Sequence, residues 1–256
     1  MKTTYFDYAA TTPVDPRVLE AMLPFFTERY GNANSLYATG RDAFRAVEAA
    51  REQVAALIGA ERPDEVIFTS GGTESDNAAL VGILSRLAPD GGGQEFKKRS
   101  GTQNTPGAAG FAKALEIMVA DQDAEIVRLS GLRDRIIDGV LSTLENTQAT
   151  TLVEPRLPHI ASLLINGVEG EAMLLQLDNL GIEVSTGSAC SSGSLEPSHV
   201  LLSIGCPPEI AHGSLRISLG RFTTDADIDR FLEVFPPIVE RLRAMSPVYE
   251  RMFGSK

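Results

Sequence analysis

The stretch from Glu65 to Leu87 places the tightest limit on the fold, because it predicts a strand that turns through glycines into a helix. Glu65 to Thr69 reads EVIFT, a short apolar run that is typical of a buried strand. Gly71 and Gly72 follow, and the residues after them carry apolar side chains at helical spacing. The sequence therefore predicts a helix N-terminus directly after a strand.

This glycine turn has the features of an anion site. Gly71 and Gly72 allow a ligand to approach the backbone closely, and the free N–H groups at the start of a helix favour negative charge. Thr73 and Ser75 add hydroxyl donors. The spacing matches neither the Walker A motif nor the dinucleotide motif G-x-G-x-x-G, so an ordinary capped helix is the alternative interpretation.

The rest of the N-terminal half is predicted to be mostly helical, because apolar residues recur at helical spacing between capping residues and glycines. The helices are expected at Asp15 to Gly31, at Thr39 or Gly40 to Gly59, and from about Ala108 to Leu144. A break near Ala120 to Asp123 could divide the last of them. The stretch from Ala88 to Gly107 has no periodicity and is expected to be a loop.

From His159 onward the pattern becomes that of a compact α+β unit, in which short apolar strands alternate with amphipathic helices. The expected strands are Ile160 to Ile165, Ile182 to Ser185 and Leu215 to Leu219. The expected helices are Glu169 to Leu180, Pro197 to Ile204 and Asp225 to about Met245.

The stretch from Ser185 to Ser194, STGSACSSGS, places a single cysteine among small residues. Serine and glycine neither fill a core nor favour a helix, so the stretch is expected to be a loop with an exposed thiol at Cys190. A thiol on such a loop suggests delivery chemistry, and a linker with an incidental cysteine is the alternative. Cys206, near a helix end, is interpreted as a small buried apolar residue.

Composition limits the compartment and the partners. The 256 residues suffice for one large or two ordinary domains, and 43% hydrophobic and 22% charged residues are typical of a soluble globular protein. The sequence shows neither a membrane-length apolar run nor a signal peptide, and its two cysteines form no zinc or disulfide pattern, which favours the cytoplasm. A net charge of -11 without a long basic cluster argues against nucleic acid as a partner.

A family resemblance rests on segments that occur in order along the chain: YFDYAATTPVDPRVLEAM, TSGGTESDN, RSGTQN, STGSACSSGSLEPSHVL and AHGSLRISLGRFTT. Together they resemble the NifS/IscS cysteine desulfurases, class V aminotransferases of the fold-type I pyridoxal-phosphate enzymes. The resemblance implies an α/β to α+β chain with a large cofactor domain and a small C-terminal domain. It also implies conversion of L-cysteine to L-alanine, with the sulfur kept as a persulfide for iron-sulfur cluster assembly or other sulfur delivery.

The resemblance also assigns roles to particular residues. Cys190 would accept the sulfur as a persulfide, and Arg216 would pair with the substrate carboxylate. Gly72 and Thr73 would hold the phosphate of pyridoxal 5'-phosphate, and Thr102 would reach the phosphate in the partner subunit, which implies a homodimer. The expected partners are L-cysteine and a sulfur-acceptor or iron-sulfur scaffold protein.

The chain departs from the family between SRLAPD and GGGQEF, near residues 88–91, where most of a domain is missing. The missing part would hold the stacking histidine, the aspartate that pairs with the pyridine nitrogen, and the lysine that binds the cofactor aldehyde. Lys97 and Lys98 lie beside the RSGT segment and are weak replacements. The chain is therefore interpreted as an impaired desulfurase, with a non-catalytic persulfide relay, a scaffold-binding protein or an inactive deletion product as alternatives.

The missing segment also shapes the expected domain organisation. Residues 1–12 are expected to form an N-terminal arm or strand, 13–147 the remnant of the large domain, and 148–256 the intact small domain. The strand at Glu65 to Thr69 would lose its neighbours and expose its backbone edges. We therefore expect a rearranged large domain, strands supplied by a partner chain, or an unstable remnant.

Overall fold

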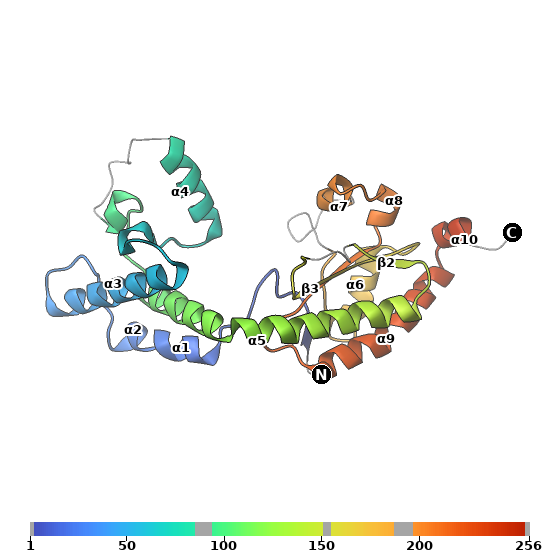
Figure 1. Ribbon diagram of the computed structural model, residues 1–256, viewed down its shortest axis with the longest axis horizontal. Helices are drawn as coiled ribbons and strands as arrows, with labels where there is room; N and C mark the ends of the chain where they lie inside the picture. Colours follow the sequence, from blue (N-terminus) through green and yellow to red (C-terminus); the bar gives the residue numbers. More distant parts are fainter. Residues whose placement is uncertain (1–2, 85–93, 151–154, 187–196, 254–256) are drawn as a thin grey trace. The chain divides into compact units, whose positions relative to one another are not determined.

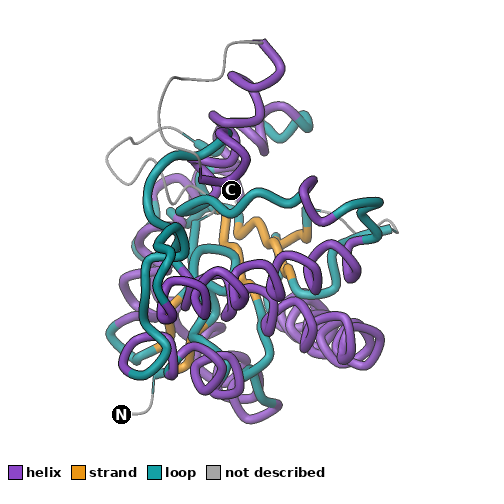
Figure 2. The backbone as a smooth tube through the Cα atoms, turned by 90° about the vertical axis from the view of Figure 1, so that its left-hand side faces the viewer, coloured by secondary structure: helices purple, strands orange, loops and turns teal. Residues whose placement is uncertain are grey.

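The computed structural model describes residues 3–84, 94–150, 155–186 and 197–253, and Cys190 therefore lies outside the described residues. The chain forms two compact units. The sheet unit comprises Met1–Thr12 and Asp123–Lys256, and the helical unit comprises Pro13–Gln122. Helix α5 (Thr105–Thr143) contributes residues to both units. Helix is far more abundant than strand along the backbone (Figure 2).

The sheet unit is built on an antiparallel sheet of order β2-β3-β5 and a parallel pair of β1 with β4. The strands are β1 (Thr4–Tyr5), β2 (Thr147–Ala149), β3 (Ile160–Ile165), β4 (Ile182–Glu183) and β5 (Ser214–Ser218). In the register of β3 and β5, Ser162 lies opposite Arg216. The helices of this unit, besides the second half of α5, are α6 (Gly170–Asp178), α7 (His199–Ser203), α8 (Pro208–Ala211), α9 (Asp225–Ala244) and α10 (Pro247–Phe253).

The alternation of side chains along β3 explains how helices cover both faces of this sheet. Leu163 and Ile165 point into the main core, which α5, α6 and α9 complete. Leu164 points to the other face, where it packs with residues of α7 and α8 (Figure 1). Helix α9 begins with a capping box in which the Thr224 hydroxyl accepts the Asp227 N–H and the Asp227 carboxylate accepts the Thr224 N–H.

The helical unit contains α1 (Pro16–Met22), α2 (Pro24–Thr27), α3 (Ala38–Ile58), the 3-10 turn η1 (Pro63–Glu65), α4 (Gly72–Leu84), the 3-10 turn η2 (Gln94–Lys97) and the first half of α5. Its core is small and consists largely of alanine and valine from α3 and α5. Arg51 of α3 forms a buried bidentate ion pair with Glu95, with N–O distances of 2.7 and 2.8 Å. Phe68 and Phe96 lie on the guanidinium, with its carbon 5.1 Å from each ring centre. This ion pair ties the stretch after residue 93 to α3.

The predicted strand at Glu65 to Thr69 is wrong. Glu65 belongs to η1, and Val66 to Thr69 pair with no strand among the described residues. Backbone groups that lack a strand neighbour need other partners. The Arg51 guanidinium donates to the Val66 carbonyl, and the Glu95 carboxylate accepts the Phe68 N–H at 3.1 Å. Two side chains thus take the place of an adjacent strand.

The other predicted elements are present, but some differ in continuity or length. The helix expected from Asp15 to Gly31 is divided at Leu23, because Pro24 begins α2 and cannot donate a hydrogen bond to continue α1. No break interrupts α5, since its helical hydrogen bonding continues from Thr105 to Thr143. The predicted strands and helices after His159 are confirmed, although most are one or more residues shorter than expected.

Candidate functional site

Arg216 lies at the centre of the candidate site, on β5. It is beside Ser185, the first residue of the stretch from Ser185 to Ser194, which we call the cysteine segment. The Arg216 N–H donates to the Ser185 carbonyl at 2.6 Å, and the Ser185 N–H donates to the Arg216 carbonyl at 3.1 Å. On the other side, Arg216 is paired with Ser162 of β3. Backbone pairing on both sides fixes the position from which the guanidinium extends.

Asp7 is the partner of this guanidinium, and the sequence analysis did not find it. The Arg216 Nη2 atom lies 2.8 Å from the Asp7 Oδ1 atom, and the two side chains are 24% and 20% exposed. The Arg216 Nε atom is buried and has no hydrogen-bond partner among the described residues. The only hint in the sequence is that Asp7 falls within the first segment of the resemblance, YFDYAATTP.

The position of Asp7 is fixed by its neighbour in the N-terminal arm, Phe6. Phe6 is fully buried, and its ring contacts Phe231 edge-on with centres 6.0 Å apart. The Phe6 N–H donates to the Glu183 carbonyl at 2.8 Å, and the Ser218 N–H donates to the Phe6 carbonyl at 2.8 Å. The Asp7 backbone is therefore held between β4 and β5, and its carboxylate has little freedom to move away from Arg216.

The N-terminus of α4 is open in the way an anion site requires. A side chain added at Gly71 or Gly72 would meet no atom within 4 Å, and Thr73 is exposed. The first N–H groups of a helix have no partner within the helix. An anion at this turn would therefore meet free N–H groups and the exposed Thr73 hydroxyl.

Glu74 lies at the same turn and is bonded to Ser70 and Arg99. Its carboxylate accepts the Ser70 N–H at 2.6 Å and the Ser70 hydroxyl at 2.5 Å, and Arg99 donates to it at 3.1 Å. The Ser70 hydroxyl, the Ser70 N–H and then Arg99 lower the pKa of Glu74 from 4.5 to about 2. Because Arg99 lies in the RSGT segment, this ion pair links the loop that carries the exposed Thr102 to the start of α4.

Glu74→Gln is expected to reduce stability at neutral pH and to leave it unchanged near pH 2. A carboxyl group whose pKa is lowered on folding stabilises the folded state above its unfolded pKa of about 4.5, and this contribution is lost as the pH falls to about 2. Thermal melting of both proteins from about pH 2 to 6 measures the difference. A constant difference in melting temperature over that range would contradict the assigned hydrogen bonds.

The described residues fit an anion at α4 but do not supply the lysine that a pyridoxal aldehyde requires. Lys113 forms an ion pair with Glu116 at 2.8 Å on α5, and Lys98 is exposed. The side chains of the other lysines, Lys2, Lys97 and Lys256, lie outside the described part of the chain. The residues in view therefore fit the phosphate end of the cofactor and not its reactive end.

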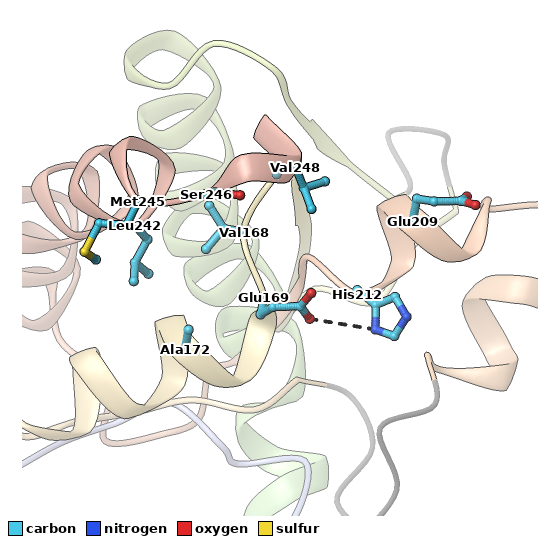
Figure 3. A pocket seen from close by; sticks show the side chains of 10 residues that line it. Val168, Glu169, Ala172, Glu209, His212, Leu242, Met245, Ser246 and Val248 are labelled. Atoms are coloured by element: carbon cyan, nitrogen blue, oxygen red, sulfur yellow. Dashed lines mark ion pairs between the residues drawn. The ribbon is translucent and has the colours of Figure 1, made fainter. Parts of the chain in front are cut away.

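A pocket of about 270 Å³ opens elsewhere in the sheet unit, between α6, α8 and the end of α9. Glu169 and His212 line it side by side, with the carboxylate 3.8 Å from the imidazole, and the Glu209 side chain points away from this pair (Figure 3). Its lining contains no lysine or cysteine and none of the residues predicted for the site. Among the described residues there is also no cluster of three metal-ligating side chains and no helix suited to crossing a membrane.

Residues 4–96 and 92–231 match the model of the aminotransferase class-V family. The cysteine desulfurase IscS 1 of Archaeoglobus fulgidus is 32% identical in an alignment that covers 96% of this chain and 100% of that protein. The chain belongs to the class V cysteine desulfurases. The cysteine desulfurase of Gluconacetobacter diazotrophicus is 31% identical over 100% of this chain and 98% of that protein.

Solved structures confirm the predicted fold class. A NifS-like protein aligns with a TM-score of 0.83 at 24% identity, covering 94% of this chain and all of that one. The alignment with the Archaeoglobus desulfurase extends over 382 positions, more than the 256 residues available, so this member of the family has a long internal gap. The two matched pieces of the family model overlap at residues 92–96, a range that includes Glu95.

Proposed function

We propose that this chain carries sulfur as a persulfide on Cys190 and passes it to an acceptor or iron-sulfur scaffold protein, with L-cysteine as the original source. The observation that supports this proposal is the backbone pairing of Arg216 with Ser185. Cys190 follows Ser185 by five residues, a length of chain that spans at most about 18 Å. A carboxylate held by Arg216 would thus be within reach of the cysteine segment.

The transfer itself needs no cofactor. The Cys190 thiolate attacks the outer sulfur of a donor persulfide, a new sulfur–sulfur bond forms on Cys190, and the donor leaves as a thiolate that takes up a proton. The total oxidation state of sulfur is unchanged, so no external oxidant is required. The same step in reverse direction delivers the sulfur to an acceptor thiol.

The positions of the described lysines favour a persulfide relay over a complete desulfurase. Release of L-alanine from L-cysteine in this family depends on pyridoxal 5'-phosphate, whose chemistry requires a lysine and groups around the pyridine ring. Lys98 and Lys113 are placed on the surface of the helical unit, and Lys113 is already paired. We therefore propose that sulfur reaches this chain from a separate donor.

The proposal includes the expected phosphate site at α4 and a homodimer. Gly72 and Thr73 would bind a phosphate at the start of α4, and Thr102 would contact the same group in the partner subunit of a homodimer. The exposure of Gly72, Thr73 and Thr102 supports this assignment. A reducing cytoplasmic location would keep the Cys190 thiol free.

Persulfide loading of the purified chain tests the proposal. After incubation with a small-molecule persulfide donor, peptide mass mapping is expected to find an added sulfur atom on Cys190. Cys190→Ser should abolish the added sulfur, whereas Cys206→Ser should leave it unchanged, because burial raises the pKa of the Cys206 thiol and lowers its reactivity. Equal labelling of both cysteines, or none on Cys190, would contradict the assigned carrier.

A further inference from the structure

The pocket of the sheet unit has the features of a small-molecule site that the proposed function does not use. Its volume is about 270 Å³, and it is lined by the turn between β3 and α6, by α6 and α8, and by the chain from the end of α9 to the start of α10. All of its lining residues are described and belong to one compact unit. A concave, largely apolar surface with a few polar groups is the usual form of a ligand site.

The apolar part of the lining gathers on one side of the pocket. It consists of Val168, Ala172, Leu242, Met245 and Val248. Val168 is 7% exposed and belongs to the main core, so this part of the lining is firmly held. In Figure 3, Val168, Ala172 and Leu242 lie on the opposite side of Glu169 from His212. The pocket therefore offers an apolar surface next to a carboxylate.

The wall that α10 contributes is fixed before any ligand arrives. A side chain added at Gly167 would lie 2.5 Å from the Tyr249 ring, so only glycine allows α10 to approach the turn this closely. The Arg243 guanidinium carbon lies 4.7 Å from the centre of the same ring, and the Asn146 amide donates to the Tyr249 hydroxyl at 3.2 Å. Because the wall is already ordered, binding costs little conformational entropy.

The charged groups of the lining favour a cation. Glu169 is the N-cap residue of α6, where the helix dipole stabilises a negative charge, yet its side chain does not cap the helix. Its carboxylate lies 3.8 Å from the His212 imidazole, which is longer than a hydrogen bond. Among the described residues, no lysine or arginine lines the pocket. The Glu169 carboxylate is therefore able to accept hydrogen bonds from a ligand.

We propose that this pocket binds a free primary amine with a compact apolar body. The ammonium group donates to the Glu169 carboxylate, and the apolar body lies on Val168, Ala172 and Leu242. The cavity is just below the range of about 300–1,000 Å³ that is typical of drug-sized ligands, so an amine with one ring is the expected size. A phosphate or a carboxylate would meet the like charge of Glu169 instead.

Titration of the full chain followed by nuclear magnetic resonance tests the proposal, with phenethylamine, 2-phenylethanol and ethylamine as probes. The alcohol keeps the ring and lacks the positive charge, and ethylamine keeps the charge and lacks the ring. Each is expected to bind about ten-fold or more weakly than phenethylamine, because one loses a charged hydrogen bond and the other the burial of the ring. Equal binding of phenethylamine and 2-phenylethanol, or no binding of phenethylamine, would overturn the proposal.

The same titration locates the ligand. Phenethylamine is expected to shift the methyl signals of Val168 and Met245, which line the pocket. Signals of Val18 in α1 belong to the other compact unit and should not move. Binding that leaves Val168 and Met245 unshifted would place the ligand elsewhere and contradict the proposal.

A pair of variants in α6 and its N-cap separates the role of the carboxylate. Glu169→Gln should weaken phenethylamine binding about ten-fold, to the level of 2-phenylethanol, and leave the alcohol unchanged. Glu171→Gln is the matched control, since Glu171 is exposed and does not line the pocket. It should change the binding of neither ligand. A preference for the amine that survives in Glu169→Gln would exclude Glu169 as its partner.

The site does not rest on the persulfide carrier, because Cys190 and Arg216 do not line the pocket. Cys190→Ser should therefore leave phenethylamine binding unchanged. Amine binding without a persulfide on Cys190 would leave the pocket assignment standing and remove the carrier function. A persulfide on Cys190 without selective amine binding would do the reverse.

Discussion

Glu95→Ala is expected to lower the free energy of unfolding of the helical unit by about 3–5 kcal/mol, the cost of leaving a buried charge without its partner. The side chains of Arg51 and Glu95 are only 2% and 1% exposed. The Glu95 carboxylate also accepts the Phe68 N–H, so the substitution leaves a backbone donor unsatisfied as well. Chemical denaturation followed by circular dichroism measures the loss.

The control for this prediction is Glu116→Ala, which breaks an ion pair with Lys113 whose side chains are 46% and 33% exposed. Surface pairs contribute about 0–1 kcal/mol, so this variant should unfold nearly as the parent does. Similar losses for the two variants would contradict the view that Arg51 and Glu95 take the place of a strand beside Val66 to Thr69.

Phe231→Ala is expected to destabilise the sheet unit by about 3–5 kcal/mol, because a fully buried ring is lost and a cavity remains. Phe231 stacks on Phe235 with ring centres 4.9 Å apart and meets Phe6 edge-on. Loss of the ring also frees Phe6 and with it the arm that positions Asp7. Thermal unfolding measures the loss of stability.

Leu175→Ala in α6 is the matched control, since Leu175 is 53% exposed and its removal opens no cavity. It should shift the melting temperature little. If Phe231→Ala melted like this control, the aromatic cluster could not be the anchor of the N-terminal arm.

The sequence predicts well the elements whose ends are marked by a few neighbouring residues, such as capping residues and glycines. The capping box of Thr224 and Asp227 marks the start of α9, and the glycine after α3 has the positive φ of 73° that a helix end often requires. Local signals of this kind need no knowledge of distant partners. The resemblance likewise rests on contiguous segments, and the family match confirms it.

The failures concern partners that are far apart in the sequence. The run from Glu65 to Thr69 has strand composition, but it becomes a strand only where another strand pairs with it. Asp7 and Arg216 are separated by 209 positions, and no spacing rule connects them. The roles of Cys190, Arg216, Gly72, Thr73 and Thr102 stay predictions.

The central claim, that this chain receives sulfur and does not release it from L-cysteine, is tested most directly by adding pyridoxal 5'-phosphate and L-cysteine to the purified chain. The measured quantities are L-alanine and the lysine adducts trapped by borohydride. The account predicts no L-alanine and no specific adduct, together with persulfide loading of Cys190 from a separate donor. Catalytic release of L-alanine with an adduct on Lys97 or Lys98 would contradict it.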